Sequence, residues 1–198
     1  MKTSETSFYS KSELATFRFK AMGKSVRISR KASFYNPGRI EIDDNSRIDD
    51  FCVISAGEGG VIIGRNVHIA VYSSLIGQGK IVIGDFANIS SRVSVFSSND
   101  DYSGNHMTNP TVDPKYTNVT HAPVHIGKHA IIGSGAIILP GIKLGDGACI
   151  GALSLVNRNC KPFTINVGIP ARFIKDRQRG LEKQYNKMLL DEVVRLSE

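Results

Sequence analysis

Aliphatic residues recur at every sixth position over much of this chain, and this period constrains the fold more than any other feature. Between residues 126 and 156 the spacing holds without a slip, and glycine follows four of the six aliphatic positions. Those positions are Ile126, Ile132, Ile138, Leu144, Ile150 and Val156. A period of six is neither the helical period nor the alternation of a single strand. It is typical of short strands joined by corners, which glycine turns easily.

The same period upstream predicts a triangular coil of three hexads. The upstream groups are Ile42, Ile48 and Ile54, then Ile63, Ile69 and Leu75, then Ile83, Ile89 and Val95. Slips near 58–60 and 78–80 are interpreted as loops that bulge from corners, and residues 24–41 as a less regular first coil with Ile28 and Phe34 inward. We therefore predict an all-β solenoid, a parallel β-helix over residues 24–176, whose long stacked faces can carry a site.

The remaining segments are expected to complete one domain, residues 1–198, since 198 residues with 41% apolar composition can form one sizeable core. Residues 10–22 are predicted to form a short helix that caps the first coil. Residues 177–197 have the pattern of an amphipathic helix that packs across an end or against a neighbouring subunit. Its apolar positions are Leu181, Tyr185, Leu189, Val193 and Leu196.

Composition indicates a soluble, cytoplasmic protein without a membrane partner, because no signal peptide or membrane-length apolar run is present. Cys52 and Cys160 fall at small inward positions of their hexads, which favours core packing over disulfides. The formal charge is +7, but no nucleic-acid-binding module accompanies it. The basic residues concentrated between 158 and 179 favour a small phosphorylated ligand.

The segment 97–122 interrupts the hexads and is expected to form a long loop. It is polar and rich in turn residues, and it contains Asp100, Asp101, Tyr102 and His121. A loop of this length in a compact solenoid is usually functional or disordered, and we interpret this one as functional.

His121, His125 and His129 are spaced by four, which on a helix would suggest a metal site. Pro123 and the hexad phase exclude a helix here, so the three side chains are expected to diverge around a corner. Zinc would then need ligands from different coils or subunits. We expect surface or interface histidines and no metal.

The hexads, the polar loop and the closing stretch NVGIPARFIK at 166–175 resemble the left-handed β-helix, hexapeptide-repeat acyltransferases. The stretches ISRKASFYNPG (28–38), NDDYSG (99–104) and IGKHAIIGSG (126–135) resemble the nucleotide-aminosugar N-acetyltransferases that act on dTDP-4-amino-4,6-dideoxyglucose. The resemblance covers about residues 10–177. It implies the left-handed coil, acetyl-CoA as co-substrate, and a homotrimer with active sites in clefts between subunits.

The resemblance also assigns candidate residues to acetyl-CoA. Backbone groups at Ser134 and Ala152 match those that bind the pantetheine arm, and polar Asn157 and Arg158 follow the last regular strand. Arg172 and Lys175 match the basic residues placed for the cofactor's phosphates. Exposed backbone groups suit an amide-rich arm, and guanidinium groups suit phosphates.

The candidate catalytic base is Asp100, because related sugar O-acetyltransferases have a histidine at the matching position. A carboxylate is a poor base for a sugar hydroxyl, but it can hold and orient an ammonium group and accept a proton. The aspartate in place of that histidine therefore favours an amino acceptor. His68 and His121 remain alternative bases, and His68 could equally pack at a subunit interface.

Together these features predict an acetyl-CoA-dependent N-acetyltransferase acting on a nucleotide-linked amino sugar for surface polysaccharide (O-antigen, lipopolysaccharide) assembly. Asp101 and Tyr102 are expected to shape the acceptor pocket, and Arg30, Lys31 and Tyr35 to hold the nucleotide end. Two alternatives stay open at this stage. One is a sugar O-acetyltransferase that uses His68 or His121, and the other is a zinc enzyme like the γ-class carbonic anhydrases.

Overall fold

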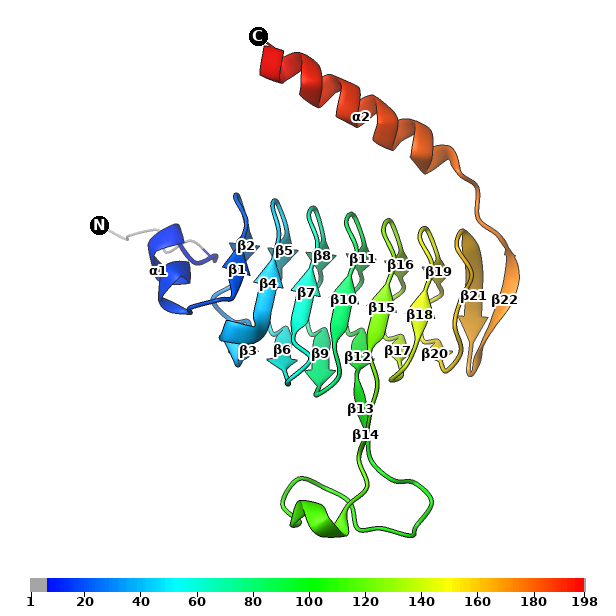
Figure 1. The fold of residues 1–198 in the computed structure, drawn as a ribbon. Helices are drawn as coiled ribbons and strands as arrows, with labels where there is room; N and C mark the ends of the chain where they lie inside the picture. Colours follow the sequence, from blue (N-terminus) through cyan, green and yellow to red (C-terminus); the bar gives the residue numbers. More distant parts are fainter. Residues whose placement is uncertain (1–6, 198) are drawn as a thin grey trace.

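The computed structural model describes residues 7–197, and its centre is a prism of three parallel sheets around one aliphatic core (Figure 1). The prediction of a left-handed parallel β-helix is confirmed. The first sheet holds β1 (Ala21–Met22), β4 (Ile40–Ile42), β7 (Val61–Ile63), β10 (Ile81–Ile83), β15 (Val124–Ile126) and β18 (Lys143–Leu144).

The second sheet lies along another face and carries the closing hairpin. It contains β2 (Arg27–Ile28), β5 (Arg47–Ile48), β8 (His68–Ile69), β11 (Asn88–Ile89), β16 (Ile131–Ile132), β19 (Cys149–Ile150), β21 (Thr164–Gly168) and β22 (Ala171–Asp176). The third sheet contains β3 (Ser33–Tyr35), β6 (Val53–Ala56), β9 (Ser74–Gly77), β12 (Ser94–Phe96), β17 (Ile137–Ile138) and β20 (Leu155–Val156). A 3-10 turn, η1 (Pro37–Arg39), joins β3 to β4.

The hexad aliphatics form the core, as their period predicts. All fifteen positions from Ile42 to Val156 are at most 1% exposed. The strand register stacks each on its counterpart one coil away, so that Ile63 pairs with Ile83 and Ile83 with Ile126. Each coil therefore removes three branched side chains from water, which is the main source of stability in such a repeat.

The glycines that follow the aliphatics are required by close approach between coils. A Cβ atom on Gly127 would lie 2.5 Å from the backbone nitrogen of Asp146 in the next coil. The left-handed conformations at the corners fall instead on other residues, such as Asn45 (φ 60°) and Asn66 (φ 55°). Asparagine tolerates that region better than most residues. The glycines that follow the aliphatics thus set the spacing of the coils, whereas other residues, Gly135 (φ 72°) and Gly141 (φ 80°) among them, turn the corners.

The first helix is shorter than the sequence predicts. It is α1 (Lys11–Thr16), opened by a capping box in which Ser10 and Glu13 exchange hydrogen bonds with each other's backbone N–H. The predicted range of 10–22 is wrong because Arg18 takes a left-handed conformation (φ 54°) and β1 begins at Ala21. Phe19 then packs on Phe34 with ring centroids 5.1 Å apart, which closes the open end of the core.

The second helix, α2 (Gly180–Ser197), begins three residues later than predicted. Arg177 lies outside it, with its backbone N–H donating to the Phe163 carbonyl at 2.7 Å and its guanidinium donating to the carbonyls of His129 and Gly147, at 3.0 and 2.9 Å. Figure 1 shows α2 running back above the coil rather than across its end. Its Tyr185 hydroxyl accepts a hydrogen bond from Arg65 (2.8 Å), and its ring packs on Phe86, 5.2 Å between centroids.

The side chains of Val193 and Leu196, predicted for the apolar face of α2, lie outside the described residues. Cys52 is fully buried as expected and burial raises its pKa to about 11, whereas Cys160 is only half-buried. Within residues 7–197, no helix is long and apolar enough to cross a membrane.

Candidate active site

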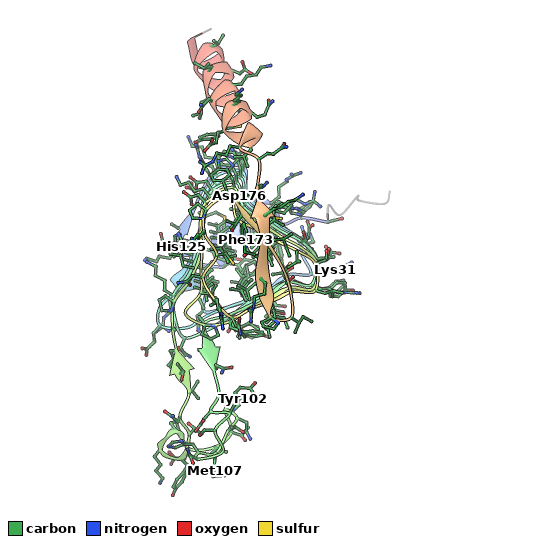
Figure 2. The ribbon with its side chains drawn as sticks, turned by 90° about the vertical axis from the view of Figure 1, so that its right-hand side faces the viewer. Lys31, Tyr102, Met107, His125, Phe173 and Asp176 are labelled. Atoms are coloured by element: carbon green, nitrogen blue, oxygen red, sulfur yellow. The ribbon has the colours of Figure 1, made fainter. Side chains whose placement is uncertain are left out.

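The long loop hangs from the coil on a two-stranded stalk. The strands β13 (Ser98–Asn99) and β14 (Thr120–His121) pair antiparallel, and a 3-10 turn, η2 (Pro114–Tyr116), lies between them. Figure 2 shows Tyr102 and Met107 well below the body of the coil. The stalk starts directly after β12, so the loop departs from the third sheet close to a corner.

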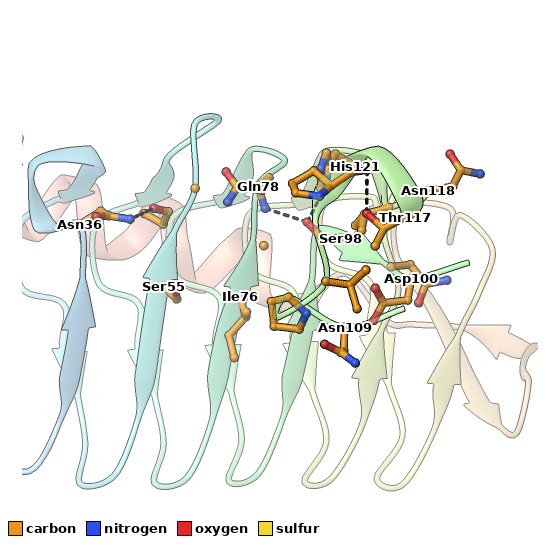
Figure 3. Close-up of a pocket in the computed structure, with 18 residues that line it drawn as sticks. Asn36, Ser55, Ile76, Gln78, Ser98, Asp100, Asn109, Thr117, Asn118 and His121 are labelled. Atoms are coloured by element: carbon orange, nitrogen blue, oxygen red, sulfur yellow. Dashed lines mark hydrogen bonds between the residues drawn. The ribbon is translucent and has the colours of Figure 1, made fainter. Parts of the chain in front are cut away.

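A cleft of about 820 Å³ lies between this loop and the neighbouring corner turns (Figure 3). Three sets of residues line it. They are Asn36, Ser55, Ala56, Gly57, Ile76, Gly77 and Gln78 from the coil, Ser98, Asn99 and His121 from the stalk, and Asp100, Asn109, Pro110, Val112, Pro114, Thr117, Asn118 and Val119 from the loop. Volumes of this size suit small-molecule ligands.

The cleft is rich in amides and contains one carboxylate. Asp100 and His121 are its titratable side chains, and the lining drawn from the described residues includes no arginine or lysine. Amide and hydroxyl groups can both donate to and accept from sugar hydroxyls. The surface therefore suits a hydroxyl-bearing ligand that carries a positive charge near Asp100.

A short hydrogen-bond chain connects His121 to the coil. The backbone N–H of Gln78 donates to Ser98 Oγ (2.8 Å), and Ser98 Oγ lies 2.8 Å from His121 Nδ1. This fixes the imidazole on the cleft wall by one nitrogen. No feature of the sequence indicates Ser98, whereas the slip at 78–80, one coil before the loop, is a signal for Gln78.

Asp101 and Tyr102 do not line this cleft, contrary to the sequence-based expectation. Asp101 turns back into the loop, where its carboxylate accepts from the Ser103 backbone N–H (2.7 Å) and contacts His106 Nδ1 (2.6 Å). Tyr102 is 87% exposed. Neighbours in sequence thus point in different directions, because the loop leaves the strand at Asp100.

His68 lies apart from Asp100 and His121, on the outer face of the second sheet. Its Nε2 is 2.8 Å from Asp49 Oδ2, and its Nδ1 is 3.2 Å from Asn88 Oδ1. Asp49 also accepts from Arg47 Nε (2.6 Å). Both ring nitrogens of His68 are therefore engaged within the chain, which is a reason to prefer the two cleft residues as candidate bases.

The histidines at 121, 125 and 129 diverge as the hexad phase predicts. His121 is on the stalk, His125 is exposed on the first sheet (Figure 2), and His129 stacks on Phe86, 5.0 Å between centroids. Desolvation is the main cause that lowers the pKa of His129. Within residues 7–197 no three His, Cys, Asp or Glu side chains gather closely enough to hold a metal ion.

The candidate acetyl-CoA residues lie on the last coils but do not form a single pocket. Ser134 and Ala152 are exposed at the same corner of successive coils, where Leu153 N–H donates to the Ser134 carbonyl at 2.9 Å. Arg158 and Arg172 line one cavity of about 440 Å³ together with Phe173. Asn157 and Lys175 are exposed outside its lining.

Two of the three residues proposed for the nucleotide end form ion pairs within the chain. Arg30 forms a two-fold ion pair with Glu13, at 2.6 and 2.8 Å, and so fastens α1 to the coil. Lys31 pairs with Asp50 at 3.1 Å. Tyr35 is 59% exposed and precedes Asn36, which does line the cleft. The assignment of Arg30 to the nucleotide therefore conflicts with its structural role.

Comparison with known proteins places these features in context. Residues 123–158 match the family described as bacterial transferase hexapeptide (six repeats). The chain is 57% identical over 169 residues to the dTDP-4-amino-4,6-dideoxy-D-glucose acyltransferase of Escherichia coli, covering 85% of this chain and 88% of that protein.

Solved structures of AntD, an N-acyltransferase from Bacillus cereus, superpose over nearly the whole chain. A variant bound to dTDP-4-amino-4,6-dideoxyglucose and coenzyme A matches with a TM-score of 0.89 and 45% identity, covering 94% of this chain and 99% of AntD. Another AntD structure, bound to dTDP and 3-hydroxybutyryl-CoA, matches with the same TM-score and identity over 94% of this chain and 98% of AntD.

Proposed function

The chain belongs to the hexapeptide-repeat acyltransferases, the family of the Escherichia coli enzyme above, and on that premise we propose that it is an acetyl-CoA-dependent N-acetyltransferase. Its acceptor is the amino group of a nucleotide-linked 4-amino-4,6-dideoxy sugar, with dTDP as the nucleotide. Its product serves the assembly of surface polysaccharide from the cytoplasmic side.

The polar lining of the cleft is the observation that supports this proposal. A single carboxylate, Asp100, stands among amide side chains such as Asn109 and Asn118, and the described lining lacks lysine and arginine. The amino sugar presents an ammonium group with a pKa of about 8, next to ring hydroxyls on one side. The carboxylate attracts the ammonium, and the amides match the hydroxyls.

Asp100 then orients the amine and takes part in its deprotonation. Once one proton is shed, the nitrogen lone pair attacks the thioester carbonyl, so that a C–N bond forms as the C–S bond breaks. The nitrogen gives up a second proton, the leaving thiolate takes up a proton, and the products are an amide and the free thiol of CoA. His121, held by Ser98, also lines the cleft and is the second group that can accept a proton there.

The two phosphates of the acceptor need cations that the cleft itself does not supply. We therefore propose a homotrimer in which a neighbouring subunit closes the cleft and supplies positive charge. The exposed loop side chains Tyr102, Met107 and Tyr116 support such a contact, since each is more than half exposed in one chain. Light scattering that found a fully active monomer would exclude this assembly.

The acetyl-CoA end remains as proposed from the family resemblance, with Ser134, Ala152, Asn157, Arg158, Arg172 and Lys175 as its residues. The cavity that Arg158 and Arg172 line supports placing phosphates there, because guanidinium groups suit phosphates. Lys31 and Tyr35 stay proposed for the nucleotide end.

A sugar O-acetyltransferase is the second candidate, and His121 is the observation that favours it. A histidine titrates near neutrality and suits a hydroxyl acceptor better than a carboxylate does. The deciding experiment offers acetyl-CoA with matched amino and hydroxy forms of one dTDP sugar and measures thiol release. Turnover of the amino form alone supports N-acetylation, and turnover of the hydroxy form alone would refute it.

A further inference from the structure

The carboxylate of Asp100 has no anchor of its own. Among the described residues it makes no hydrogen bond or ion pair, although it lines the cleft. Its backbone, by contrast, is held on one side, because Asn99 pairs with Thr120 in the stalk. The direction of the Asp100 side chain therefore depends on what holds the chain on its other side.

That other side is held by Asp101, Ser103 and His106, which we call the clasp. Asp101 Oδ1 accepts from the Ser103 backbone N–H at 2.7 Å, and Asp101 Oδ2 lies 2.6 Å from His106 Nδ1. Ser103 Oγ accepts in turn from the Asn105 backbone N–H at 3.2 Å. The turn passes through Gly104, whose φ of 82° lies in the region that favours glycine.

Asp101 is shielded from solvent within the clasp, although the loop around it is exposed. The Asp101 side chain is only 10% exposed, while that of His106 is 44% exposed. Hydrogen bonds from Ser103 and then from His106 lower the pKa of Asp101 to about 2. Because the carboxylate is ionised, His106 must donate through Nδ1, and this nitrogen is not free to act as a base.

We propose that the clasp of Asp101, Ser103 and His106 positions the catalytic carboxylate, by fixing the chain immediately after Asp100 at the angle that directs its side chain into the cleft. These residues are positioning residues that do not touch the substrate. The inference rests on the proposed function for its catalytic consequence. A misplacement of about 1 Å at a reacting group can cost about a hundredfold in rate.

The test compares His106→Ala with His106→Asn in the full-length protein. Asparagine places an amide N–H where Nδ1 stood but cannot titrate, so it keeps the clasp and removes any acid–base role. We expect His106→Ala to lower kcat about ten- to a hundredfold with an unchanged KM for acetyl-CoA, and His106→Asn to stay within about threefold of the wild type. His125→Ala, at an exposed histidine outside the loop, is the matched control.

A second measurement needs no substrate. Hydrogen exchange at the Ser103 and Asn105 amides should accelerate in His106→Ala but not in His106→Asn, because these amides donate within the clasp. If the wild type turned over no amino sugar, the proposed function would fail while exchange still tested the clasp.

Three results would overturn the inference. The first is a wild-type kcat in His106→Ala, and the second is unchanged amide exchange in that variant. The third is an Asn variant as slow as the Ala variant, which would mean that His106 acts through its own proton. Thermal unfolding and light scattering of each variant establish that the coil and its assembly are intact.

Discussion

Replacement of Asp100 by asparagine tests the core of the proposed chemistry, because it keeps the side-chain shape and removes the only carboxylate among the described residues that line the cleft. The lost charge-assisted contact to an ammonium is worth roughly 1.5–3 kcal/mol, or about ten- to a hundredfold. Loss of a proton acceptor lowers the rate further, since general bases contribute about a hundred- to ten-thousandfold to the rate. We expect kcat/KM at pH 7 to fall by at least about a hundredfold.

The pH dependence of this deficit separates amine from hydroxyl acceptors. An amine with a pKa of about 8 is roughly one-tenth neutral at pH 7 and roughly nine-tenths neutral at pH 9. The variant should therefore regain roughly tenfold relative to the wild type as pH rises over this range. A hydroxyl titrates far above it and offers no such recovery.

The assay is release of free CoA thiol with the amino sugar nucleotide at several pH values. Asp113→Asn is the matched control, because Asp113 is in the same loop, does not line the cleft, and asparagine caps η2 equally well. Equal rates for wild type and Asp100→Asn at pH 7 would remove Asp100 from the mechanism and leave His121 as the base. A large deficit that did not change with pH would argue against an amine acceptor.

Three further predictions address the cofactor end, the N-terminal helix and the core. Replacing Arg172 and Lys175 by alanine should raise the KM for acetyl-CoA about ten- to a hundredfold per lost phosphate contact and leave that for the sugar unchanged; a parallel rise in both would contradict the assignment. Hydrogen bonds from Arg30 and then Ser10 lower the pKa of Glu13 to about 2 from an ordinary 4.5, so the stability they contribute is present above pH 4.5 and lost as pH falls toward 2. Glu13→Gln should thus lower Tm at pH 7 by an amount that shrinks on acidification, and a constant difference would exclude this linkage. Leu75→Ala, at a fully buried position, should cost about 2–5 kcal/mol in chemical denaturation, and a loss below 1 kcal/mol would mean that the coil collapses around the cavity.

The solenoid could be predicted from the sequence because a repeat imposes the same environment on every equivalent residue. Ile63, Ile83 and Ile126 stack because each coil repeats the backbone path of the last, so a correct period already says which side chains are buried. The boundaries of the loop followed for the same reason, since it is the segment where the period stops. Asp100 was proposed as the base from the family resemblance, by counting on from the strand at 88–95, and the structure shows that it lines the cleft.

The contacts of individual loop and surface residues were decided only by the tertiary structure. Asp101 was expected in the acceptor pocket, but hydrogen bonds to Ser103 and His106 direct it into the loop. Arg30 was expected at the nucleotide and instead pairs with Glu13, seventeen residues earlier in the chain. The hexad period does not determine the partners of such side chains, because each can pair with several groups at similar energy. Only the folded chain determines which partner lies within reach.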